Sequence, residues 1–238
     1  MRVWDVQEGV TLAISFEEMA RRVAIAVAAL AGLGVRKAEH LAILSHASAQ
    51  FYVYALAVMS HGAVCAVLNW RQPLDVLKHM AGSSRSTILM ASAAFAEHAA
   101  AIAHDVPDIV RVLWLSMPPI APPNGASLPD LSSASAPASC GGPSRIERVH
   151  ADTMCLILFT SGSTSMPKPT PFTHDDLLWS SEHNMQQALR FRTEFAQPGA
   201  GTVCFLPNFH VIGFMNNFMM KYAPYRPNAT LRLSPARA

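Results

Sequence analysis

The chain has 238 residues, of which 51% are hydrophobic and 14% are charged, and its formal net charge at pH 7 is +2. This length and apolar content are enough for a sizeable buried core, and they exclude a disordered or highly charged chain. The near-neutral charge, without a block of Lys and Arg, argues against nucleic-acid binding, which usually needs a concentrated basic surface.

The first half of the sequence alternates helix patterns with short apolar runs. The capping box SFEE at 15–18 opens a helix whose apolar residues recur at helical spacing until Gly34, a helix terminator. Further helices are predicted at 49–60, about 73–81 and near 93–103, and strands at 40–45, 63–68, 87–90 and 110–115. This alternation is typical of parallel βαβ units. We therefore expect a layered α/β fold with mostly parallel sheets and flanking helices.

Residues 117–144 break this rhythm, because they are rich in Pro, Ser, Ala and Gly and have little apolar periodicity. They indicate a long surface loop or linker, and either a subdomain boundary or a simple insertion explains them. We divide the chain into a first α/β subdomain at 1–116, a loop or linker at 117–150 and the start of a second α/β subdomain at 151–238.

The second half begins with an apolar run at 153–159, which is typical of a central parallel strand. THDD at 173–176 is a second capping pattern, and it opens a helix that continues to about residue 190. A strand at 202–206 and a helix at 210–221 are predicted after it.

The spacing of the cysteines and the lack of a signal-peptide pattern indicate the cellular compartment that we expect for this protein. The four cysteines lie far apart and form no CxxC pair, so the sequence predicts neither a metal site nor a disulfide framework. The longest apolar stretch near the N-terminus, residues 23–35, is too short to span a bilayer. Glu17 and Glu18 precede it, which does not fit a signal peptide. We expect a soluble, cytoplasmic protein in a reducing environment.

Residues 156–174, LILFTSGSTSMPKPTPFTH, join a buried strand to the second capped helix. Ligands bind beyond the C-terminal ends of strands in α/β sheets, so the position suits a binding site. Hydroxyls and successive backbone N–H groups can surround phosphate oxygens, and Lys168 adds a mobile charge. The Walker A pattern fails, because Pro167 and Pro169 stand where it needs Gly and Ser or Thr. From composition alone, a Ser/Thr/Pro-rich surface turn remains the alternative.

Three segments resemble one family. FTSGSTSMPK resembles the signature [ST]SG[ST]TGxPK of the adenylate-forming superfamily, which includes acyl-CoA synthetases, peptide-synthetase adenylation domains and luciferases. HLAILSHASAQFYVYALAVMSHGAVCAVLNWR is similar to the family segment that ends in GAVxxPLNxR, and FLPNFHVIGF resembles its PLFHxxG segment. The resemblance covers nearly the whole chain and implies an incomplete large N-terminal domain of the adenylate-forming fold. It also implies a ligase that turns ATP and a carboxylate into an acyl-adenylate, whose acyl group a CoA or carrier-protein thiol then takes.

The resemblance also assigns site residues. Those implied to hold the ATP phosphates are Thr160, Ser161, Gly162, Ser163, Thr164, Ser165 and Lys168. Those implied to line the carboxylate and acyl side are Asn208, Phe209, His210 and Gly213. Lys168 and His210 are the expected catalytic residues, and Ser165 replaces a glycine of the signature. No FDxS motif is present to pair with an ammonium, which favours an acid without an α-amine.

Other family motifs are absent from these residues. The YGxTE and TGD motifs and the small domain with a catalytic lysine do not occur, so Mg²⁺ is implied by the family while its carboxylate is not on this chain. We expect the N-terminal part of an adenylate-forming enzyme with little turnover alone. The alternative is a non-catalytic remnant or interaction module that holds a nucleotide, an acyl group or a partner protein. A serine hydrolase using Ser163 and His174 is a minor alternative, because Gly-x-Ser-x-Gly is missing.

Overall fold

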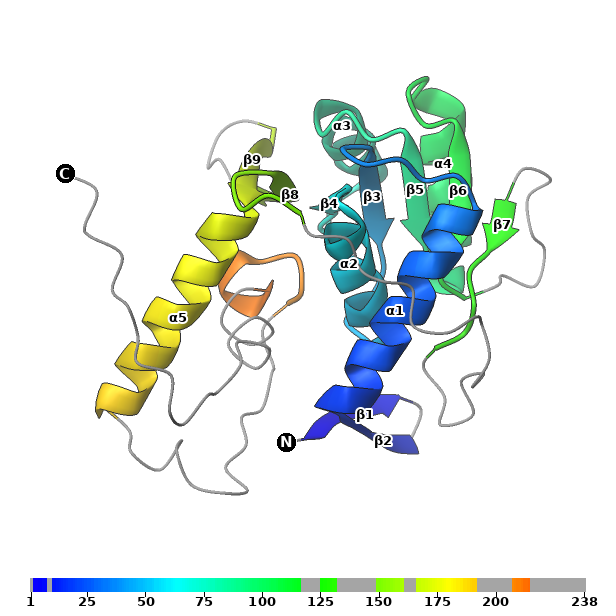
Figure 1. Ribbon diagram of the computed structural model, residues 1–238. Helices are drawn as coiled ribbons and strands as arrows, with labels where there is room; N and C mark the ends of the chain where they lie inside the picture. Colours follow the sequence, from blue (N-terminus) through cyan, green and yellow to red (C-terminus); the bar gives the residue numbers. More distant parts are fainter. Residues whose placement is uncertain are drawn as a thin grey trace.

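The computed structural model describes residues 2–7, 10–116, 125–131, 149–160, 166–191 and 207–214 (Figure 1). Its strands are β1 (Arg2–Gln7), β2 (Val10–Ser15), β3 (His40–Leu44), β4 (Val64–Val67), β5 (Ile88–Ala91), β6 (Arg111–Trp114), β7 (Gly125–Ser127), β8 (Met154–Thr160) and β9 (Lys168–Thr173). Its helices are α1 (Phe16–Gly32), α2 (Ala49–His61), α3 (Leu74–Ser83), the 3₁₀ turn η1 (Ala93–Phe95), α4 (Ala96–Asp105) and α5 (His174–Phe191).

Seven strands form one sheet in the order β7-β6-β5-β3-β4-β8-β9, and only the β8–β9 pair is antiparallel. The predicted α/β fold with a mostly parallel sheet and flanking helices is confirmed. Helix α2 leads from β3 outward to β4, and α3 brings the chain back past β3 to β5. The strand order therefore reverses between β3 and β5, and such sheets bind ligands beyond the C-terminal strand ends at that point.

Both faces of the sheet are covered by helices. Alternate residues of a strand point to opposite faces, so Leu41 and Ile43 pack with residues of α1 and α2, whereas Ala42 and Leu44 pack with residues of α3 and α4. Figure 1 shows α1 and α2 together in front of the sheet and α3 and α4 behind it. Burial on both faces explains why the strands read as continuous apolar runs without alternation.

Gly34 is confirmed as a helix terminator, and Gly62 ends α2 in the same way. Gly34 and Gly62 adopt φ values of 74° and 85°, in the left-handed region that favours glycine. After α1, the Val35 N–H bonds to the Leu30 carbonyl at 3.0 Å, and the same type of bond joins Ala63 to Val58 after α2 at 3.1 Å. These contacts satisfy carbonyls that a helix end leaves unpaired.

The second predicted capping pattern is also confirmed. The Asp176 N–H donates to Thr173 Oγ1 at 3.1 Å, and the Thr173 N–H donates to Asp176 Oδ2 at 2.8 Å, which together form a reciprocal capping box. For the first pattern, α1 does begin directly after Ser15, whose side chain lies outside the described residues. The strand predicted at 202–206 also lies outside them, and of the helix predicted at 210–221 only 210–214 is described.

Part of the predicted loop at 117–150 joins the sheet. Strand β7 pairs with β6, and the residues after it are held by α1 and α2. Gln50 Nε2 donates to the carbonyls of Leu115 and Pro129 at 3.0 and 2.9 Å, and its Oε1 accepts from the Leu131 N–H at 2.8 Å. Arg22 Nη1 donates to the Leu131 carbonyl at 2.6 Å. The strands before and after this region share one sheet, and the division into subdomains remains a prediction.

Candidate functional site

The candidate phosphate loop closes a hairpin between β8 and β9. Thr160 and Lys168 are the last paired residues, and Thr160 Oγ1 donates to the Lys168 carbonyl at 3.5 Å. The loop follows the C-terminal end of β8, where the sequence places it. Five residues that the resemblance assigns to the phosphates lie outside the described residues: Ser161, Gly162, Ser163, Thr164 and Ser165.

Strand β9 is not predicted by the sequence, which joins the loop directly to a helix. Its sequence KPTPFT has two prolines, and proline donates no hydrogen bond to a sheet. Strand β9 is an edge strand, and Pro169 and Pro171 are two residues apart, so both can occupy positions whose N–H would point away from β8. Helix α5 consequently begins at the other end of β9, where the His174 N–H bonds to the Thr153 carbonyl at 3.1 Å.

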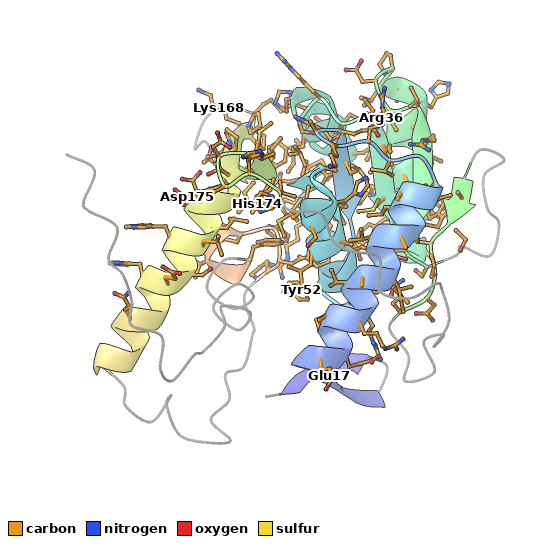
Figure 2. The ribbon with its side chains drawn as sticks, viewed as in Figure 1. Glu17, Arg36, Tyr52, Lys168, His174 and Asp175 are labelled. Atoms are coloured by element: carbon orange, nitrogen blue, oxygen red, sulfur yellow. The ribbon has the colours of Figure 1, made fainter. Side chains whose placement is uncertain are left out.

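Lys168 is exposed at the outer end of this hairpin (Figure 2). No carboxylate among the described residues forms an ion pair with its ammonium group. The residue before it, Pro167, is contacted from α3: His79 Nε2 lies 3.2 Å from the Pro167 carbonyl oxygen. The lysine charge is therefore available to an anion in solution.

The segment 207–214 packs on the C-terminal ends of two strands. Asn208 is 1% exposed, and its Nδ2 donates at 3.3 Å to the carbonyl of Ser45, the residue that follows β3. The Phe209 ring meets Trp70, shortly after β4, edge to face with centroids 6.0 Å apart. Phe214 is fully buried and lies edge to face with Phe51 of α2 at 6.4 Å. The polypeptide around His210 is thus anchored at both ends.

The four residues predicted for the acyl side fall into two groups. Asn208 and Gly213 are buried, whereas Phe209 is half-buried and His210 is exposed. His210 Nδ1 accepts from the Ile212 N–H at 3.3 Å, so a neutral ring carries its proton on Nε2. Asn208 Oδ1 is buried and has no hydrogen-bond partner in the described part of the chain. Of these four residues, His210 has the exposed side chain that can donate a hydrogen bond to a ligand.

Sequence reasoning missed an aromatic cluster at the same edge of the sheet. The His46 ring lies 4.5 Å from Trp70 and 4.8 Å from Phe95, and the guanidinium of Arg71 lies 5.0 Å from the Trp70 centroid and 5.9 Å from Phe209. Their place in the sequence could have indicated this cluster, because His46, Trp70 and Phe95 each follow a predicted strand within a few residues. Trp70 and Arg71 of this cluster contact Phe209 at the start of segment 207–214.

His174 lies at the opposite end of β9 from Lys168. It begins α5 at the far end of β9, and desolvation by burial lowers its pKa. Its Nε2 has no hydrogen-bond partner in the described structure. Ser163 lies outside the described residues, so the hydrolase that pairs it with His174 stays a minor alternative from the sequence.

Among the described residues, no group of three or more His, Cys, Asp or Glu could hold a metal ion. None of their helices is long and apolar enough to cross a membrane. Cys65 and Cys155 are buried free thiols, and Cys140 and Cys204 lie outside the described residues.

Curated proteins and solved structures resemble this chain. A feruloyl-CoA synthase from Amycolatopsis sp is 29% identical over 168 residues, covering 71% of this chain and 30% of that protein. A 4-coumarate–CoA ligase-like protein from Oryza sativa subsp. japonica is 31% identical over 210 residues, covering 85% of this chain and 36% of that protein. The chain therefore spans about a third of the length of these relatives.

Two solved structures share the fold. An acetoacetyl-CoA synthetase from Streptomyces lividans matches with a TM-score of 0.71 at 18% identity, over 90% of this chain and 33% of that one. ATP-bound MatB from Rhodopseudomonas palustris matches with a TM-score of 0.66 at 23% identity, over 91% of this chain and 40% of that one. The model of the AMP-binding enzyme family matches residues 6–223. This match covers most of the 238 residues of the chain. The chain therefore belongs to the AMP-binding enzyme family.

Proposed function

We propose that this chain binds ATP at the loop after β8 and supplies the phosphate and acyl sides of a ligase that activates a carboxylic acid as an acyl-adenylate. One observation carries the proposal: the residues that flank the phosphate loop, Thr160 and Lys168, and segment 207–214 lie at the C-terminal strand ends of one sheet. Strands β3, β4 and β8 are parallel, so Ser45, Trp70 and Thr160 all mark C-terminal ends at that edge. Lys168 and His210 extend from segments that meet these ends.

Lys168 and the loop hydroxyls form the phosphate side in this proposal. An ATP triphosphate carries several negative charges, and the exposed Lys168 ammonium offsets part of them. As pyrophosphate leaves, charge grows on its oxygens, and donors already placed around them stabilise it. Thr160 stands at the base of the loop, and the implied ligands at 161–165 would complete it. Magnesium would supply further charge neutralisation, but the described residues contain no cluster to hold it.

His210 forms the carboxylate side in this proposal. With Nδ1 occupied by the Ile212 N–H, the ring presents Nε2–H as a donor to a carboxylate oxygen. Residues 207–214, PNFHVIGF, contain no carboxylate that could pair with an ammonium group. We therefore propose an aryl, fatty or other carboxylic acid without an α-amine, in agreement with the names of the feruloyl-CoA synthase and coumarate-ligase-like relatives.

The proposed ligase reaction also indicates the acceptor of the acyl group and the cellular compartment. A thiol of CoA or of a carrier protein would take the acyl group, and the relatives include both a CoA synthase and a hybrid PKS-NRPS synthetase from Penicillium oxalicum. We propose the cytoplasm as the compartment, because it supplies ATP and CoA and keeps thiols reduced.

A second candidate is a non-catalytic module that binds a nucleotide or an acyl group, or that serves as an interaction module for a partner protein. It is favoured by one observation: Asn208, one of the residues assigned to the acyl side, is 1% exposed and its amide donates to the Ser45 carbonyl. Binding without chemistry is the signature of this candidate.

ATP binding and ATP–pyrophosphate exchange over a panel of carboxylic acids separate the candidates. We expect Lys168→Ala to weaken ATP binding about 10- to 100-fold, the range of a lost charge-assisted hydrogen bond. The matched control is Arg36→Ala, which removes an 80%-exposed cation before β3, at the opposite edge of the sheet, and should leave binding unchanged. Exchange by the wild-type chain supports the ligase, and binding without exchange supports the module. A wild-type chain that binds no ATP refutes the proposed ligase.

A further inference from the structure

One contact from outside the hairpin reaches the exit of the phosphate loop. His79 of α3 lies with Nε2 3.2 Å from the Pro167 carbonyl oxygen. A carbonyl oxygen only accepts, so His79 Nε2 carries a proton and donates it. His79 is exposed, so core packing does not account for the position of its ring. The two residues are 88 positions apart in the chain: His79 lies in α3, and Pro167 directly precedes β9.

The backbone around Lys168 has little freedom of its own. The rings of Pro167 and Pro169 fix φ at both positions. Residues that precede proline are confined to extended conformations, which applies to Met166 and to Lys168. Lys168 is indeed the first residue of β9. The least restricted torsion in this stretch is ψ of Pro167, which sets the direction of its carbonyl and of the peptide that leads into Lys168.

The His79 hydrogen bond acts on that torsion, because it holds the Pro167 carbonyl in one direction. On the other side of Lys168, the Thr160 hydroxyl donates to the Lys168 carbonyl at 3.5 Å. Thr160 and Lys168 are also opposite each other in the β8–β9 ladder. The two peptides that flank Lys168 are therefore held from two different elements, α3 and β8. The lysine side chain itself stays exposed.

We propose that His79 is a positioning residue for Lys168: by holding the Pro167 carbonyl, it directs the lysine toward the anion that the loop binds. This inference rests on the proposed function, since it takes the anion to be the ATP phosphates. His79 does not itself touch the phosphates. Its role is to reduce the number of directions in which the Lys168 ammonium points before ATP arrives, which lowers the ordering cost of binding.

The first test measures the contact without ATP. Hydrogen–deuterium exchange of the peptide covering residues 166–173 is compared in wild type, His79→Ala and His79→Gln. Glutamine keeps an N–H donor on a side chain of similar reach, so we expect faster exchange in His79→Ala and wild-type exchange in His79→Gln. Equal exchange in all three proteins would overturn the contact as a restraint. The matched control, His183→Ala, removes an exposed helical histidine on α5 and should change nothing in this peptide.

The second test measures affinity with a fluorescent ATP analogue. We expect His79→Ala to weaken binding about two- to tenfold, the range of one net hydrogen bond, and His79→Gln to restore it. In a Lys168→Ala background, His79→Ala should have no further effect, because a positioning residue acts only through the group it positions. Additive losses from the two substitutions would overturn the proposal.

The two tests separate this inference from the proposed function. If the wild-type chain binds no ATP analogue, the proposed function fails and the phosphate role of His79 fails with it. The exchange measurement then still decides whether His79 restrains Lys168. If ATP binds normally while His79→Ala changes neither exchange nor affinity, only the inference about His79 is refuted.

Discussion

Gln50 provides the sharpest stability test, because its buried side chain joins α2 to Leu115 and residues 128–131 through several hydrogen bonds, whereas Tyr54 adds one, from its hydroxyl to the Pro129 carbonyl at 3.1 Å. Gln50 is 7% exposed and makes hydrogen bonds of 3.0, 2.9 and 2.8 Å to backbone groups of Leu115, Pro129 and Leu131. A net hydrogen bond contributes about 0.5–1.5 kcal/mol, and buried partners left unpaired cost more. We therefore expect Gln50→Ala to lower the free energy of unfolding by about 2–4 kcal/mol.

Urea denaturation followed by circular dichroism measures this loss. Gln72→Ala is the control, because Gln72 is only half-buried and its loss should cost less than about 0.5 kcal/mol. Gln50→Glu sharpens the test further: it keeps the acceptor but turns the donating NH₂ into a carboxylate that faces two carbonyl oxygens. We expect Gln50→Glu to destabilise at pH 7 at least as much as alanine. A loss below about 1 kcal/mol in Gln50→Ala, with an unchanged denaturant slope, would refute the reasoning.

The remaining predictions concern charge, burial and thiol reactivity. The hydrogen bond from Arg21 is the largest cause that lowers the pKa of Glu18 to about 2, so stability from this carboxylate is complete above about pH 4.5 and disappears as the pH falls toward 2. Glu18→Gln should therefore flatten the fall of the melting temperature between pH 4.5 and 2, and parallel wild-type and variant curves would contradict this. Asn208→Asp should destabilise the fold more than Asn208→Leu, because it buries a carboxylate that lacks a donor; equal urea midpoints would argue otherwise. Burial raises the pKa of Cys155 to about 12 and raises that of Cys65 as well, so iodoacetamide at pH 8 should modify neither thiol until urea is added, as read by peptide mass mapping.

Local signals in the sequence predicted much of the fold. Gly34 and Gly62 take up the left-handed conformation that glycine adopts most readily, just after the last residues of α1 and α2. The apolar runs at 40–45 and 153–159 correspond to buried strands, because a strand covered on both faces excludes polar residues. Strand β9 escaped prediction because two prolines argue against a strand, and their edge position is visible only once the sheet order is known.

The candidate site was predictable in part. The sequence placed the loop directly after a buried strand, and β8 is that strand. Long-range contacts were not predictable, because no local pattern pairs His79 with Pro167 or Asn208 with Ser45. The amide of Asn208, assigned to the substrate by resemblance, contacts a backbone carbonyl in the core, and whether any of the assigned residues touches a ligand remains a prediction.

The place of β8 in the sheet also affects how the chain folds as it is made. Strand β8 pairs with β4, with Cys65 opposite Leu156, so about ninety residues must be synthesised between the two partners. At a typical 5–20 residues per second, β4 stays an open sheet edge for roughly 5–18 s after it leaves the ribosome. An unpaired edge is a template for pairing with other chains. The nascent protein is therefore most exposed to aggregation before β8 emerges, at a stage when its first helices and strands are already complete.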